Sequence, residues 1–388
     1  MIRLGVIGYG DRISQIVKIL QQLNNNAKVV SVIDPNQKAV GERVSSSNGD
    51  YVFRDSISEM VQLDKPDGLL IGTRCQLHAP YAIEAAKYDI PLFLEKPVAI
   101  SLEQTIALEK AFSKSKCNVV VSFPLRVSPI CTLARENIES GMIGTCEHIT
   151  ALNYVPYGTC YWELFYRNYE STQGLLVQKA THDLDYISYL MDSDIVNIAA
   201  LASYGRVFGG TKRAGLKCSD CDEARGCAES PYNRQKYGAD NSDHLCLFSA
   251  DCGTPKTGMN EDATSVLIEF ASGAHGIYTQ VFFSRRDTEI RTAIISGYHG
   301  TINFDFYSSS LKYTAHHKAF SSNTKFETNS NHFGGDVELA RNFIDVITVG
   351  AKSFTPIETG LKSIYACLAA KESIKTRGFV SVRQIGKI

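Results

Sequence analysis

The sequence lacks a surplus of either charge. Among its 388 residues, 40 Lys and Arg stand against 41 Asp and Glu, which leaves a formal net charge of −1 at pH 7. A chain without a basic surplus has no electrostatic field that would hold a polyanion or an anionic membrane. We therefore expect neither nucleic acid nor a membrane surface as a partner.

Long hydrophobic runs are missing as well. No apolar stretch reaches the roughly 18 residues that a membrane span requires. The N-terminal apolar segment Arg3–Ile7 also lacks the sequence pattern of a secretion signal. Internal repeats and low-complexity tracts are also absent from the sequence. The 11 cysteines are an odd number and mostly scattered singly, which is typical of reduced thiols. These features predict a cytoplasmic protein with about two domains.

Residues 1–123 alternate short apolar segments with helical patterns. Near-continuous apolar strands separated by helices are typical of a parallel sheet that is covered on both faces. We therefore predict a doubly wound α/β domain over 1–123, a Rossmann arrangement. The predicted strands are Leu4–Ile7, Val29–Ile33, Tyr51–Phe53, Gly68–Ile71, Leu92–Leu94 and Val119–Phe123.

The alternation of predicted strands and helices ends at about residue 124. Strand patterns follow one another without long helices between them, which favours hairpins and a large, mostly antiparallel sheet. We predict an α+β domain over 124–388, with an insertion at about 205–262 that is rich in Gly, Ser, Asp and Cys. The predicted strands are Cys146–Leu152, Ile195–Ala202, Ser265–Phe270, His275–Phe283 and Thr292–Ile295, and closing helices are predicted at Val337–Val349 and Leu361–Thr376.

A glycine turn follows the first predicted strand. Glycines in such a turn let backbone N–H groups approach a pyrophosphate at the N-terminus of the next helix. Ile13 takes the place of the third glycine of the usual pattern, which predicts looser packing of helix on strand. Asp34 ends the second strand, where a carboxylate binds the adenosine ribose and repels a 2′-phosphate, so NAD is favoured over NADP. The alternative is a glycine turn of another α/β fold, with Asp34 as a helix cap.

Two further motifs lie at strand ends. Thr73 and the tripeptide Glu95-Lys96-Pro97 fall at the carboxyl edge of the sheet, where open α/β sheets bind ligands. A desolvated lysine there can stabilise an alkoxide or relay a proton, and the alternative for Lys96 is an ordinary ion pair. The candidate cofactor contacts are Gly8, Tyr9, Gly10, Asp11, Arg12, Ile13, Asp34, Thr73, Arg74, His78, Glu95, Lys96 and Pro97.

Taken together, these motifs make the chain resemble the Gfo/Idh/MocA oxidoreductase family. The resemblance also covers Gly174 to Asp185, the strand Ser265–Phe270 and the segment Gly334-Gly335-Asp336. It implies a Rossmann domain with NAD, an open-faced sheet domain, and a sugar, glycoside or cyclitol substrate held between the sheet and the nicotinamide. It further implies a homo-dimer or homo-tetramer formed through the open sheet.

The segment from Gly174 to Asp185 supplies the second group of candidates. Thr181 is a predicted helix N-cap, which would leave His182 exposed in the first turn, with an ordinary pKa and free to act as general base. In many members of the family an Asp lies four residues before this His, but Gln178 stands there in this chain. Lys179 resembles a subgroup with lysine at this place and is a third catalytic candidate. A solvated helix end is the alternative for Lys179 and His182.

Substrate contacts are predicted in the second half. Asp183 is either a substrate ligand or a charge that suits the helix N-terminus, and Arg126 is either a ligand or an interdomain ion pair. Aromatic and hydrogen-bonding residues around 154–168 suit a sugar pocket. The candidate substrate contacts are Arg126, Tyr157, Arg167, Lys179 and Asp183.

The insertion carries a cluster of cysteines. Four thiolates can close a tetrahedral structural zinc site, and the resemblance to relatives with a similar insertion selects Cys218, Cys221, Cys227 and Cys246. Free thiols in an ordered loop are the alternative.

The sequence thus predicts an NAD-dependent dehydrogenase that oxidises a hydroxyl group to a ketone or catalyses the reverse reduction, with Lys96 and His182 handling the proton. One alternative is a glycosidase that oxidises its sugar transiently and shows no net change of nicotinamide. The other is a non-catalytic NAD-binding regulator, against which the presence of both Lys96 and His182 argues.

Overall fold

The computed structural model describes residues 1–44, 50–156, 159–234, 244–252, 259–327 and 331–386. Within them, the first half of the chain forms a six-stranded sheet in the order β3-β2-β1-β4-β5-β6, with every pairing parallel. This is the predicted doubly wound arrangement. The strands are β1 (Ile2–Ile7), β2 (Ala27–Ile33), β3 (Val52–Phe53), β4 (Gly68–Ile71), β5 (Leu92–Leu94) and β6 (Val119–Val121).

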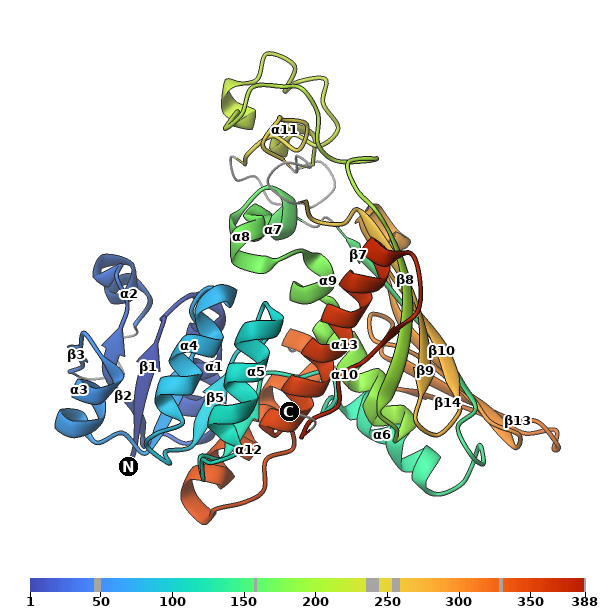
Figure 1. Cartoon of the computed structure of the whole chain (residues 1–388), viewed down its shortest axis with the longest axis horizontal. Coiled ribbons are helices and arrows are strands. Elements are labelled where there is room, and N and C mark those ends of the chain that lie inside the picture. Colours follow the sequence, from blue (N-terminus) through green and yellow to red (C-terminus); the bar gives the residue numbers. More distant parts are fainter. Residues whose placement is uncertain (45–49, 157–158, 235–243, 253–258, 328–330, 387–388) are drawn as a thin grey trace.

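Helices cover both faces of this sheet (Figure 1). The longest of those between its strands, α1, buries Ile13, Ile16, Val17 and Leu20, which recur at helical spacing and therefore share one face. The helical elements of this half are α1 (Asp11–Leu23), α2 (Gln37–Arg43), α3 (Ile57–Glu59), η2 (Met60–Asp64), α4 (Cys75–Ala85) and α5 (Leu102–Phe112).

The second half forms a nine-stranded sheet in the order β14-β13-β12-β11-β7-β10-β9-β8-β15. Its pairings are antiparallel except that of β7 with β10, so the predicted mostly antiparallel sheet is confirmed. The strands are β7 (His148–Pro156), β8 (Ile195–Ser203), β9 (Ala263–Phe270), β10 (His275–Ser284), β11 (Ile290–Ser296), β12 (Gly300–Asp305), β13 (Ser310–Ala315), β14 (Ser321–Lys325) and β15 (Val380–Ser381).

Helices α10, α13 and α6 lie against the large sheet, and in Figure 1 no helix of the described residues covers the face turned away from α10 and α13. None of the helices in the described ranges is both long and apolar enough to cross a membrane. The helical elements of this half are α6 (Pro129–Glu139), α7 (Thr159–Trp162), η3 (Phe165–Arg167), α8 (Tyr169–Thr172), α9 (Leu175–Gln178), α10 (Ala180–Met191), η4 (Cys218–Asp220), α11 (Pro231–Arg234), η6 (Arg286–Thr288), η7 (Asn331–Gly334), α12 (Gly335–Val349) and α13 (Ile357–Thr376).

Helix α12 returns to the first sheet, although it follows the second sheet in the sequence. Leu339, Phe343 and Val346 belong to the same buried cluster as residues of β1, β5 and β6. The rings of Phe343 and Phe93 meet edge to face with centroids 5.6 Å apart, and a side chain at Gly68 would collide with Ile347 at 2.6 Å. The preceding segment, η7, therefore lies near the carboxyl edge of the parallel sheet, where Asp336 at the start of α12 contacts Arg12.

Candidate active site

The glycine turn between β1 and α1 has the geometry of a phosphate-binding loop. Gly8 has a φ of +79°, and a Cβ there would lie 2.7 Å from the backbone nitrogen of Thr73. Gly10 caps α1, and a Cβ on it would approach only the carbonyl oxygen of Gly72, at 3.9 Å. The backbone at Gly10 is thus open to a ligand at the N-terminus of a 13-residue helix, which fits the pyrophosphate of a dinucleotide.

The missing third glycine does not loosen the helix, contrary to the expectation from the sequence. Ile13 is fully buried, and a Cβ added to Gly72 would lie 1.8 Å from its Cγ1. The close approach of helix and strand is therefore retained, because the glycine has moved from the helix to the end of β4.

Two acidic side chains near the glycine turn, Asp34 and Asp11, are fixed by hydrogen bonds and an ion pair. Asp34 accepts hydrogen bonds from the backbone nitrogens of Tyr9 (2.9 Å) and Asn36 (2.8 Å), which fixes its carboxylate at the end of β2 beside the glycine turn. Asp11, in the first turn of α1, pairs with Arg43 at 2.7 Å. Asp34 thus stands where the ribose of a dinucleotide would bind.

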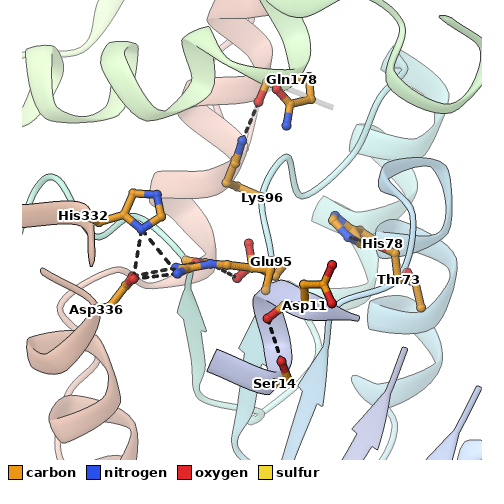
Figure 2. Close-up of polar contacts among 11 residues, drawn as sticks. Asp11, Ser14, Thr73, His78, Glu95, Lys96, Gln178, His332 and Asp336 are labelled. Carbon is orange, nitrogen blue, oxygen red and sulfur yellow. Dashed lines mark hydrogen bonds and ion pairs between the residues drawn. The ribbon is translucent and has the colours of Figure 1, made fainter. Parts of the chain in front are cut away.

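His78 connects the two strand-end loops. Its ring nitrogens lie 2.8 Å from the carbonyl oxygen of Pro97 and 3.0 Å from that of Thr73, and its side chain is buried. Burial lowers the pKa of this imidazole, while the hydrogen bonds to Pro97 and Thr73 and the charge of Glu95 oppose the shift. A neutral ring can donate to only one of the two carbonyl oxygens. His78 thus links the loops that follow β4 and β5 (Figure 2).

Lys96 lies at the centre of the candidate site (Figure 2). Its Nζ donates a hydrogen bond of 2.7 Å to the carbonyl oxygen of Gln178, so it connects the end of β5 to the end of α9. Burial lowers the pKa of Lys96 to about 8, and the positive charges of Arg291 and Arg12 act in the same direction, while Cys75 and Glu95 oppose the shift. A lysine in this state can both donate and accept a proton near neutral pH.

Arg12 is engaged in an ionic network. It forms two hydrogen bonds of 2.6 Å to the carboxylate of Asp336 in α12 and one of 3.0 Å to Glu95. Asp336 also lies 2.9 Å from Nδ1 of His332. Burial alone would raise the pKa of Asp336, but the hydrogen bonds from His332 and Arg12 and the charge of Arg12 lower it to about 2. Arg12 and Glu95, predicted as cofactor contacts, therefore join the glycine turn to the C-terminal half.

His182 is buried, not exposed as the sequence predicted, with only 5% of its surface accessible. The predicted N-cap is also wrong, because α10 begins at Ala180 with Lys179 at the cap position and without a side-chain cap. The ring lies 6.0 Å from the rings of both Phe123 and His332. Burial, followed by the charge of Lys96, lowers the pKa of His182 well below its usual value of 6.5.

Polar atoms without a partner gather at this turn of the chain. The Oε1 atom of Gln178, the Oγ1 atom of Thr181 and the Nδ1 atom of His182 are buried and have no hydrogen-bond partner within the described residues. Buried polar groups are nearly always satisfied in folded proteins. Three such groups lie within five residues of the chain, in the same segment whose Gln178 carbonyl oxygen accepts the hydrogen bond from Lys96.

Lys179 and Arg74, which were predicted to contact substrate and cofactor, each lie over an aromatic ring. The ammonium of Lys179 lies 5.4 Å from the ring centre of Tyr161, and the guanidinium of Arg74 lies 4.3 Å from that of Phe165. Both aromatic residues come from the segment that was predicted to form a sugar pocket.

Asp183 does not remain a substrate candidate. It is fully buried and accepts hydrogen bonds from Asn153 (2.9 Å), Tyr278 (2.9 Å) and Arg291 (2.9 and 3.0 Å). Its two oxygens thus connect α10 to three strands of the large sheet.

Arg126 and Arg167, the two arginines predicted to contact substrate, both form ion pairs within the protein. Arg126 forms an ion pair with the buried carboxylate of Asp185 at 3.0 Å, although both residues lie in the predicted second domain and the pair is therefore not the interdomain one expected. Arg167 pairs with Asp251 at 2.8 Å and donates to the carbonyl oxygen of Cys246, so it anchors the insertion. Tyr157 lies outside the described residues.

The four cysteines chosen as metal ligands line one cavity of about 430 Å³ in the insertion. Lys212 also lines it, and its ammonium lies 3.6 Å from Sγ of Cys221. No three His, Cys, Asp or Glu side chains in the described part of the chain are arranged to hold a metal ion. The cysteines therefore do not fit a zinc site as they stand, and the zinc prediction is not supported.

His332 was missed in the sequence. The segment Gly334-Gly335-Asp336 had been noted, but not the histidine four residues before the aspartate. Gly335 explains the motif, because a Cβ on it would lie 1.8 Å from the carbonyl oxygen of Pro124. The spacing His-x-x-x-Asp at the start of a predicted helix was the signal that could have revealed the pair.

Comparison with protein families decides the classification. Residues 2–123 match the oxidoreductase family's NAD-binding Rossmann fold, and residues 135–382 match its C-terminal alpha/beta domain. The chain belongs to the Gfo/Idh/MocA oxidoreductase family. The resemblance inferred from the motifs is thereby confirmed.

Known relatives of this family member include two dehydrogenases of cyclitols. Identity is 24% with the inositol 2-dehydrogenase of Corynebacterium glutamicum (strain R), over 51% of this chain and 56% of the relative. It is 25% with the scyllo-inositol 2-dehydrogenase (NAD(+)) of Bacillus subtilis (strain 168), over 53% and 58%. The chain thus spans little more than half the length of these relatives. A solved levoglucosan dehydrogenase in complex with NADH shares the fold, with a TM-score of 0.78, 18% identity, and coverage of 99% of this chain and 100% of that one.

Proposed function

We propose that this family member is an NAD-dependent dehydrogenase that converts a hydroxyl group of a sugar, glycoside or cyclitol to a ketone, or catalyses the reverse reduction. The observation that carries the proposal is the position of Lys96, with its pKa of about 8, next to the unpaired polar atoms of Gln178, Thr181 and His182. The names of the inositol and levoglucosan relatives support the substrate class.

NAD fits the residues of the glycine turn. The open backbone at Gly10 would hold the pyrophosphate, and the Asp34 carboxylate would hold the ribose hydroxyls and disfavour a 2′-phosphate. When bound, NAD supplies the hydride acceptor. The chain's own residues hold the substrate alcohol and handle its proton.

Lys96 stabilises the oxygen of the alcohol in this proposal. The desolvation that lowers its pKa shows that the ammonium has given up hydration, so its charge acts strongly on a nearby developing alkoxide. The neutral ring of His182 contributes a hydrogen bond at Nδ1, which lacks a partner in the described protein.

The test is incubation with NAD or NADP and a panel of sugars, glycosides and cyclitols, while nicotinamide reduction is followed by absorbance and products by mass spectrometry. We expect NADH to form in proportion to ketone, with NAD preferred over NADP. A cleaved glycoside without net nicotinamide change would identify the transient-oxidation glycosidase instead. NADH binding without any conversion would favour a regulator and contradict the proposal.

We also propose that the protein forms a homo-oligomer through the open face of the large sheet. Leu267, Ile277 and Ile294 are exposed, and the pairing registers place them in one row across β9, β10 and β11, with Thr150 of β7 between the last two. An apolar row of this kind is typical of an interface. Light scattering coupled to size exclusion should give a dimer or tetramer, and Leu267→Lys should shift the mass towards the monomer.

A further inference from the structure

His332 and Asp336 form a carboxylate–imidazole pair beside His182. Nδ1 of His332 lies 2.9 Å from Oδ2 of Asp336. Asp336 is almost fully buried and is itself fixed by the two hydrogen bonds of 2.6 Å from Arg12. The guanidinium of Arg12 also lies 3.3 Å from Nδ1 of His332. Because a carboxylate can only accept, the bond to Asp336 requires the proton on Nδ1, which leaves Nε2 as the proton acceptor. Figure 2 shows this second nitrogen turned to the side on which Lys96 lies.

The backbone that carries His332 is strained. His332 and Phe333 have φ values of 47° and 56°, so two consecutive residues other than glycine adopt the left-handed conformation. Packing of the Phe333 ring against Phe306 (5.2 Å between centroids) and Tyr307 (5.6 Å) maintains this conformation. Strain of this type persists where the surroundings enforce it, and it concentrates at functional sites.

His182 lacks the support that His332 has. Its Nδ1 has no partner in the described structure, and Gln178 stands where a carboxylate would otherwise lie. The charged groups that act on its ring are Lys96, Arg291, His332 and Lys179, all of which oppose a second positive charge. An imidazolium at His182 would therefore be uncompensated.

The electrostatic surroundings of His332 are mixed. Burial lowers its pKa, the hydrogen bond and charge of Asp336 raise it, and Arg12 and Lys179 lower it. About a third of the side chain is exposed, so this ring is accessible and has a carboxylate next to it. Of the two histidines, His332 is the one that can take up a proton with its charge compensated.

We propose that His332, held by Asp336, is the base that accepts the proton of the substrate hydroxyl, and that His182 only positions the substrate. The inference rests on the proposed dehydrogenase function and adds the residue that takes the proton. The O–H bond breaks, the proton goes to Nε2 of His332, and the electron pair of that bond forms the carbonyl. The hydride of the same carbon passes to NAD, so the alcohol loses one proton and one hydride.

The experiment compares His332→Gln, His332→Ala, Asp336→Asn and His182→Gln in the full-length protein. His148→Gln is the matched control, because His148 is also half-buried and its ring meets another, that of His275, edge to face with centroids 5.0 Å apart. NADH affinity is measured by fluorescence, and kcat/KM by nicotinamide reduction with the best substrate of the panel, across pH. Unchanged NADH affinity shows that the site has folded.

We expect His332→Gln to lower kcat/KM by about 100-fold or more, the usual contribution of a general base, and His148→Gln to leave it unchanged. Added imidazole should restore part of the rate of His332→Ala, which a merely structural role would not allow. Asp336→Asn should move the acid limb of the pH profile to lower pH, because the imidazolium loses its carboxylate.

Wild-type kcat/KM in both His332 variants, with loss only in His182→Gln, would overturn the inference and leave the dehydrogenase function intact. If the wild type binds NADH but converts no member of the panel, the proposed function fails, and the assignment of His332 as its base fails with it.

Discussion

The two sides of the candidate site are built differently. On the N-terminal side, Gly8 to Ile13, Thr73 and Glu95 to Pro97 directly follow strands of the parallel sheet. On the C-terminal side, Gln178 to His182 and His332 to Asp336 lie on short helical segments and helix starts. The first side takes its positions from the regular geometry of the sheet. The second takes them from ion pairs and burial, above all those of Asp336 and Asp183. The first side is thus fixed by local strand geometry, and the second by contacts between residues that are distant in sequence.

The largest effect is expected from Lys96, which belongs to the N-terminal side but contacts the C-terminal one. Lys96→Ala should lower kcat/KM by about 10³-fold, since the charge that stabilises the alkoxide is lost, while NADH affinity changes little.

In the wild type, kcat/KM should fall as the pH rises past about 8, where Lys96 loses its proton. Lys96→Arg should not show this fall, because arginine stays protonated. Lys110→Ala, on the exposed face of α5, is the control. Equal rates for both alanine variants would contradict the role of Lys96.

Asp336 tests the C-terminal side. Its pKa is lowered to about 2 from 3.8, so the carboxylate contributes about 2 kcal/mol to the free energy of unfolding at neutral pH. This contribution is present above about pH 4 and is lost as the pH falls towards about 2. Asp336→Asn should therefore unfold at lower denaturant concentration at pH 7, and the difference from wild type should shrink in acid. Glu338→Gln, two residues further along α12 and half-exposed, is the control and should change stability little. A difference that does not depend on pH would contradict the ionic network.

Gly10 separates cofactor binding from stability. A methyl group there meets only the Gly72 carbonyl oxygen at 3.9 Å, so Gly10→Ala should leave the melting temperature unchanged. It should weaken NADH binding by about tenfold or more, because the pyrophosphate can no longer approach the backbone. Gly378→Ala, with nothing within 4 Å of its added Cβ, is the control. NADH affinity equal to wild type would show that the turn does not hold the dinucleotide.

The smallest effect is expected at Gln178. In Gln178→Asp, a carboxylate next to Lys96 should raise the pKa of the lysine, so the alkaline limb of kcat/KM should move up by about one pH unit. Gln178→Asn, which shortens the side chain without adding charge, should leave the limb in place. If the alkaline limb of kcat/KM lies at the same pH in both variants, the side chain of residue 178 does not act electrostatically on Lys96.

The contrast also explains what the sequence could predict. The strands Gly68–Ile71 and Leu92–Leu94 were predicted with their observed bounds, because buried parallel strands are continuous apolar runs. Lys96 could be placed at the sheet edge for the same reason. The strands β12 to β14 were missed. Strand β14 reads Ser-Ser-Asn-Thr-Lys and carries no apolar alternation, whereas β12 and β13 do alternate, at Ile302 and Phe304 and at Leu311 and Tyr313.

The C-terminal side resisted prediction because its decisive contacts are distant in sequence. Arg12 meets Asp336 across 324 positions, and Asp183 meets Arg291 across 108. Local pattern identified Asp183 as a helix-start charge but gave no sign of its three partners on the sheet. His182 was predicted as exposed for the same reason, since nothing nearby in sequence reveals that η7 lies over it.

Because α12 packs on the first sheet, the N-terminal half depends on a helix from the C-terminal part of the chain. Leu339, Phe343 and Val346 complete the core of the parallel sheet, so a fragment cut after residue 123 would leave Phe93 and its neighbours facing water. Within the described residues the chain also passes between the two halves around residues 122–128, and α12, which packs on the first sheet, follows strands of the second sheet in the sequence. Because the two halves are joined at more than one place in the sequence, we expect rotation of one half against the other to be more restricted than about a single linker.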